Sequence, residues 1–116
     1  MQRIISLLIL TVIVACPAYA VSGKEGEKID YLLSELENSP LKFIRNGDEH
    51  SGKEAAGHLR AKLQYAGDRV KTVEDFITLV ATKSSYSGEP YFVKLGNGQK
   101  IPARDWMFKK LKDRKD

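Results

Sequence analysis

The sequence predicts an α+β domain in which two β-hairpins form a small antiparallel sheet, packed with about four helices in the order α-(ββ)-αα-(ββ)-α. Three observations support this fold class. Apolar residues recur at helical spacing in several segments of the 116-residue chain. Asn-Gly pairs at positions 46–47 and 97–98 each lie between short apolar runs, as they do in hairpins. No repeat, low-complexity stretch or long linker appears, which indicates a single domain.

Residues 1–20 are typical of a bacterial export signal that is removed from the mature protein. Arg3 provides a positive start, and the apolar run Ile4–Ala15 is shorter than the roughly 20 residues that span a bilayer. Ala18-Tyr19-Ala20 is the small-x-small pattern that signal peptidase cleaves. We therefore expect cleavage after Ala20, a single domain over residues 21–116, a periplasmic location and no membrane span.

Cys16 suggests an alternative, because Ile13–Cys16 also has the shape of a lipoprotein signal in which the cysteine carries a lipid anchor. It is the only cysteine of the chain, so ordinary cleavage would leave no thiol for a disulfide, a catalytic nucleophile or a metal site. The full chain has a formal net charge of +4, which is mildly basic. With no known binding motif present, this charge argues against a nucleic-acid partner.

The first predicted helix covers about Lys24–Asn38 and ends before Pro40, because a residue that precedes proline avoids helical angles. A strand of about Leu41–Arg45 then leads into the first hairpin. In a type I′ turn at Asn46-Gly47, the strand residues pair as Arg45 with Asp48, Ile44 with Glu49 and Phe43 with His50. Arg45 and Asp48 would form an opposite-charge pair. The hairpin alone requires neither Arg45 nor His50, which leaves both for another purpose.

Two capped helices are expected next. Ser51 and Glu54 form a capping box at the start of the second helix, which Gly67 ends. Thr72 caps the third helix, which is expected to end near Lys83.

The polar loop "SSYSGEP" separates these helices from the second hairpin. Its strands are expected at about Tyr91–Leu95 and Gln99–Ile101. Pro102 suits the first turn of a last helix that presents Trp106, Met107 and Leu111.

No complete catalytic set can be assembled from the sequence, so a non-enzymatic function is favoured. His58 is expected as a half-buried helix residue bonded to backbone. A hydrolase or ligand-sensing enzyme would need His50 or His58 beside a serine of the loop Ser84–Ser87, but no G-x-S-x-G or S-x-x-K motif is present. The two histidines have no H-E-x-x-H motif and no thiolate near them, so neither a metal nor a cofactor is expected.

An anion or partner site is the main remaining possibility. Arginine suits carboxylate or phosphate recognition. If the loop after the third helix lies beside the first hairpin, cations and hydroxyls from both segments could converge. The candidate residues are Arg45, His50, His58, Lys83, Ser84, Ser85 and Ser87. The sequence therefore favours an envelope module that binds a small anionic ligand or another envelope protein, and the hydrolase stays open as the alternative.

The segments "FIRNG", "EAAGHLRAKL", "TVEDFITLVATKSSYSGEPYFVKL" and "DWMFKKL" occur in this order along the chain. Together they resemble the YfeK-like family of small exported bacterial proteins, a family of unknown function. The resemblance implies a single α+β domain and supplies no activity, cofactor or substrate. Many relatives carry cysteines at the positions of Leu41 and Leu95, so the resemblance implies that these two leucines meet across the sheet.

Overall fold

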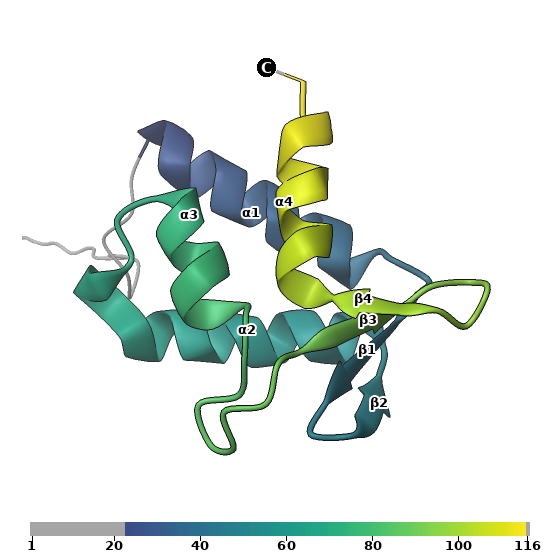
Figure 1. Ribbon diagram of the computed structural model, residues 1–116. Helices are drawn as coiled ribbons and strands as arrows, with labels where there is room; N and C mark the ends of the chain where they lie inside the picture. The colour runs from purple at the N-terminus through teal and green to yellow at the C-terminus, as the bar shows by residue number, and fades with distance from the viewer. Residues whose placement is uncertain (1–22, 116) are drawn as a thin grey trace, which may run out of the picture.

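The computed structural model describes residues 23–115, and the order of its elements confirms the predicted α+β fold (Figure 1). The predicted export signal, its cleavage site and Cys16 lie outside the described residues. The helices and strands, in chain order, are α1 (Gly23–Glu37), β1 (Lys42–Arg45), β2 (Asp48–His50), α2 (Gly52–Ala66), a 3-10 turn (Gly67–Arg69), α3 (Val73–Asp75), a π-helical turn (Phe76–Val80), β3 (Phe92–Lys94), β4 (Lys100–Pro102) and α4 (Ala103–Asp113). No helix among the described residues is long and apolar enough to cross a membrane.

The sheet has the strand order β2-β1-β3-β4, and each neighbouring pair is antiparallel. The first hairpin has the predicted register, with Phe43 opposite His50 and Arg45 opposite Asp48. Its turn also has the expected positive φ at both central residues, 53° at Asn46 and 84° at Gly47. The two hairpins join through β1 and β3, so the first strand of each hairpin lies at the centre of the sheet and the second strand lies at an edge.

The core lies between one face of the sheet and the helices. Phe43 is opposite Val93 in the β1–β3 ladder, and Val93 is opposite Ile101 in the β3–β4 ladder, so all three point to the same side. On that side the ring of Phe43 meets the ring of Trp106 from α4, edge to face, with centroids 5.4 Å apart. The same β1–β3 register, continued by one residue, places Leu41 opposite Leu95, and both pack against the core.

The third helix ends earlier than the sequence suggests. Thr72 and Asp75 form a capping box at its start, but the helical segment stops at Val80 instead of near Lys83. The last turn is π-helical, and the Ala81 N–H donates to carbonyl groups in it. The Thr82 hydroxyl then donates to the Ile77 carbonyl at 2.7 Å, which closes the helix end. The chain therefore turns toward the sheet three residues sooner than apolar periodicity indicates.

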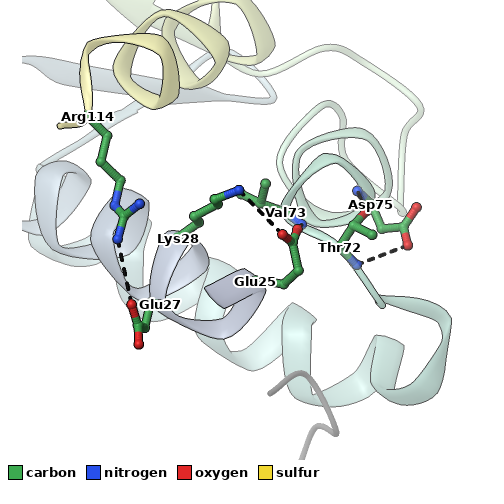
Figure 2. A network of polar contacts seen from close by, with 7 residues as sticks. All are labelled: Glu25, Glu27, Lys28, Thr72, Val73, Asp75 and Arg114. Carbon is green, nitrogen blue, oxygen red and sulfur yellow. Dashed lines mark hydrogen bonds and ion pairs between the residues drawn. The ribbon is translucent and has the colours of Figure 1, made fainter. Parts of the chain in front are cut away.

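Glu25 ties the start of α1 to the start of α3 (Figure 2). Its carboxylate accepts a hydrogen bond of 2.8 Å from the Val73 N–H and lies 3.4 Å from the Lys28 ammonium. The Val73 N–H is one of the donors that a helix N-terminus leaves without an internal partner. The hydrogen bond from Val73 is the largest cause that lowers the pKa of Glu25, and Lys28 adds to it. Helices distant in sequence are thus joined at their polar ends.

Gly52 allows α1 and α2 to approach each other closely. A Cβ atom at this position would overlap the carbonyl oxygen of Leu36 and would lie 3.0 Å from that of Ser39. Both obstacles are backbone atoms, which cannot move aside as a flexible side chain would. The glycine therefore fixes the spacing between the C-terminus of α1 and the first turn of α2, and this junction forms one wall of the pocket described below.

Candidate anion-binding pocket

A pocket of about 100 Å³ lies between the first hairpin and α2, with α1 and α4 behind it. Apolar side chains from all of these elements form most of its wall, including Leu36, Phe43, Ala55, Leu59 and Met107. The polar residues of the wall are fewer and come from the hairpin and from α2, namely Arg45, His50, Glu54 and His58. An apolar cavity with a few convergent polar groups is the usual form of a small-molecule site.

The sheet register explains why the polar residues meet. Ile44 is opposite Phe92, so the same register places Tyr91 opposite Arg45. Because His50 is opposite Phe43, two residues before Arg45, these side chains share one face of the sheet.

The helix spacing of α2 brings further polar groups to that face. Glu54, His58 and Lys62 recur at intervals of four residues, so they lie on one side of α2. The pocket wall is therefore built where this side of α2 faces the sheet.

Two side chains of α2 contact the Tyr91 hydroxyl. Its oxygen lies 3.3 Å from Nε2 of His58 and accepts a hydrogen bond of 3.1 Å from the Lys62 ammonium. Lys62 also donates to the carbonyl of Lys83 at 2.8 Å and lies over the Tyr91 ring, 5.0 Å from its centroid. His58 is half-buried as expected, but its partner is a tyrosine hydroxyl and not the backbone.

The electrostatics of these groups are dominated by burial and by Arg45. Burial lowers the pKa of His58 and of Lys62, and the nearby Arg45 charge lowers both further. Lys62 and His50 add smaller effects in the same direction on the pKa of His58. Burial raises the pKa of Tyr91, with Arg45 acting in the opposite sense. The cluster is therefore rich in positive charge, which an anion would relieve.

The side chain of Arg45 makes no hydrogen bond or ion pair with any residue in the described range 23–115. Asp48 is the cross-strand neighbour of Arg45 as predicted, but the two charged groups are too far apart to form the expected ion pair. The acidic residue of β2 that does form an ion pair is Glu49, with Lys94 of β3 at 2.9 Å. Arg45 is half-buried beside the pocket, so a guanidinium with five donors is held there without a protein acceptor.

His50 has one engaged and one unengaged ring nitrogen. Its Nδ1 lies 3.8 Å from Oε1 of Glu54, and that carboxylate also accepts a hydrogen bond of 2.9 Å from the Ser51 N–H. The hydrogen bond from Ser51 is the main cause that lowers the pKa of Glu54. The Nε2 atom of His50 is buried and has no partner within the described part of the chain. A buried polar atom without a partner calls for an explanation, and a bound ligand is one.

The serine loop does lie beside the first hairpin, but its hydroxyls are used by the fold. Ser84 Oγ accepts from the Nδ2 of Asn46 at 3.4 Å and from the N–H groups of Tyr86 and Ser87. The Ser87 hydroxyl donates to Oδ1 of Asn46. Within residues 23–115, neither histidine contacts Ser84, Ser85 or Ser87, so the pairing that a serine hydrolase would need is not formed.

Four of the predicted site residues do not line the pocket, namely Lys83, Ser84, Ser85 and Ser87. The side chain of Lys83 is exposed, and only its backbone carbonyl takes part, as the acceptor for Lys62. Ser85 is exposed and lines a separate surface hollow that also includes Tyr65 and Leu79. Among the described residues, no group of three or more His, Cys, Asp or Glu side chains could hold a metal ion.

Sequence reasoning about the site missed Lys62, Tyr91 and Glu54. The spacing from His58 could have suggested Lys62 and Glu54, since residues four apart share a helix face. Tyr91 could not be placed from spacing, because its position depends on the pairing of two strands that are far apart in the sequence.

The fold and pocket define a small α+β domain with a largely apolar cavity that carries a few polar groups at one end. This chain belongs to a family of unknown function, DUF5329, whose pattern matches residues 23–115. It is similar to the uncharacterized protein YfeK of Salmonella typhimurium, with 39% identity over 93 residues that cover 78% of this chain and 77% of the relative. The resemblance to YfeK-like proteins is thereby confirmed. No solved structure matches the chain.

Proposed function

We propose that this protein is an exported, non-enzymatic binding module of the bacterial periplasm, and that its pocket binds a small anion. The composition of residues 1–20 supports export, with an ordinary signal cleaved after Ala20 as the expected route and a lipid anchor at Cys16 as the alternative. The pocket supports binding over hydrolysis, because the His58 ring contacts the Tyr91 hydroxyl and neither histidine hydrogen-bonds to a serine of the loop Ser84–Ser87 within residues 23–115.

The observation that carries the proposal is the pair of unused donors beside one cavity. Arg45 has no acceptor among the described residues, and Nε2 of His50 is buried without a partner. A carboxylate or phosphate could accept from the guanidinium, and from Nε2 of His50 when the ring carries a proton there. A charge-assisted hydrogen bond to arginine is among the stronger polar contacts in proteins. Glu54 is the one acidic residue of the wall, and the Ser51 N–H and His50 hold its charge at the opening.

The test compares butyrate with butyramide, which has the same shape and no charge, in thermal unfolding of the purified protein at matched ionic strength. A ligand that binds only the folded state raises the unfolding temperature. Butyrate is expected to raise it, and butyramide is not. Arg45→Gln should abolish the rise, whereas Arg104→Gln, which removes an exposed arginine on α4, should keep it. Equal responses to the two ligands, or an unchanged response in Arg45→Gln, would rule out the proposal.

Binding of an envelope protein is a second candidate, and exposed apolar side chains favour it. Tyr65 is 88% exposed and Leu79 is 54% exposed, and both line the surface hollow that also includes Lys62 and Ser85. Crosslinking in the native envelope should recover a protein that Tyr65→Ser and Leu79→Ser together release and that Arg45→Gln leaves bound. A crosslinked product that is unaffected by the Tyr65 and Leu79 changes would exclude this surface.

A further inference from the structure

Building on the proposed anion pocket, we infer that its ligand is a short-chain monocarboxylate with an apolar tail of about four carbons. The carboxylate lies at Arg45 and His50, and the tail points toward the wall formed by α1 and α4. The burial of the cavity wall determines the orientation of the ligand and its single charge. The cavity volume determines the length of its tail.

The direction follows from the burial of the wall. The side chain of Glu54 is 66% exposed and that of His50 is 28% exposed, so the polar part of the wall lies toward solvent. Leu36 and Met107 are each only 1% exposed, so the opposite part of the wall is apolar and enclosed. A ligand with a charged end and an apolar end fits this gradient in one orientation.

The length follows from the volume. An apolar cavity of about 150 Å³ accommodates benzene, which has six carbons, so the volume of about 100 Å³ found here corresponds to about four. This volume includes the space beside Arg45 and His50, so the tail has at most about four carbons. The tail would contact Leu59 and Ala55 of α2 along its length.

The ligand is expected to carry a single charge, because only the exposed end of the cavity wall is polar. A second carboxylate at the far end of the ligand would be buried against Leu36 and Met107 without a hydrogen-bond partner, which is strongly unfavourable. Inorganic phosphate has no tail to fill the apolar part. The Ser51 N–H and Nδ1 of His50 partly offset the charge of Glu54 toward the head group. The Nε2 atom of His50 donates to the ligand when both ring nitrogens carry protons.

Calorimetric titration of the purified protein with acetate, butyrate, pentanoate, succinate and inorganic phosphate tests this inference. Each buried CH₂ group is worth roughly a fourfold gain in affinity, so pentanoate, with three more CH₂ groups, should bind about 60-fold more tightly than acetate. Succinate and phosphate should bind no better than acetate. Ala55→Val, which adds volume to the pocket wall, should shift the preference to shorter acids, and Ala61→Val on the exposed side of α2 should not.

The outcomes separate the inference from the proposed function. Arg45-dependent binding of acetate, succinate and phosphate as tight as that of pentanoate would overturn the chain-length inference and leave an anion site. An unchanged chain-length preference in Ala55→Val would also overturn it, because the tail would then lie elsewhere. Failure of every anion to bind the wild-type protein would overturn both.

Discussion

Arg45 of β1 lies opposite Tyr91 in the register of the β1–β3 ladder. Together with burial, its charge lowers the pKa of His58 and of Lys62, the two side chains that contact the Tyr91 hydroxyl. The arginine itself has no acidic partner among the described residues. One side chain of the first hairpin thus adds to burial in lowering the pKa of two side chains of α2.

Removal of the Arg45 charge should raise the pKa of His58, because a positive neighbour disfavours the protonated imidazole. The change is Arg45→Gln, and the measurement is an NMR titration of the His58 ring protons. Arg104→Gln provides the control, since Arg104 is exposed on α4. An identical His58 titration in wild type and Arg45→Gln would show that the two groups do not interact.

His58 should make stability depend on pH near neutrality. Its pKa is lowered in the folded state, so the unfolded chain binds the proton more readily between the ordinary value of about 6.5 and the lowered one. The stabilisation is therefore complete above about pH 6.5 and is lost as the pH falls through the folded-state value. Urea unfolding at several pH values from 8 to 5 should show this decline, and the decline should be smaller in His58→Gln. Equal slopes in the two proteins would contradict the assignment.

Tyr91→Phe should destabilise the fold by about 1–2 kcal/mol, because it removes the hydroxyl that His58 and Lys62 share. Lys62 would keep the Lys83 carbonyl as an acceptor, which limits the loss. Chemical unfolding gives the free energy directly. Tyr65→Phe is the matched control, because Tyr65 is almost fully exposed and should change stability by less than about 0.5 kcal/mol. A similar effect of the two changes would mean that the hydroxyl contributes nothing.

Gly52→Ala should destabilise the protein by about 3 kcal/mol or more, because the added methyl group overlaps the Leu36 carbonyl and forces α1 and α2 apart. Gly57→Ala is the matched control on the same helix, where a Cβ atom meets nothing within 4 Å. This second change should stabilise by about 0.5–1 kcal/mol, since alanine favours a helix interior over glycine. Thermal unfolding of both variants measures the two changes in stability. A Gly52→Ala variant as stable as the wild type would contradict the close approach of α1 and α2 at this position.

Local signals in the sequence predicted local structure well. The Asn46-Gly47 pair indicated the turn and the register of the first hairpin, the capping box of Ser51 and Glu54 indicated the start of α2, and the N-cap Thr72 indicated the start of α3. The predicted end of the third helix was wrong by three residues. The pattern of apolar residues continues through the π-helical turn, so it does not indicate where the helix ends.

The candidate site could be predicted only in part. Arg45 and His50 stood out because the hairpin did not require them. Lys83 and Ser85 were included on charge and polarity alone, and their side chains lie at the surface away from the pocket. Tyr91 could be assigned to the site only from the β1–β3 pairing. This pairing joins two hairpins that are far apart in the sequence, and local sequence patterns do not predict it.

The most direct test of the anion pocket is the nitrogen NMR signal of His50 during a titration with pentanoate. The account predicts a saturable shift of the His50 Nε2 signal that is absent with pentanamide and absent in Arg45→Gln. A His50 signal that stays constant while pentanoate binds, or a shift that persists without Arg45, would contradict the account.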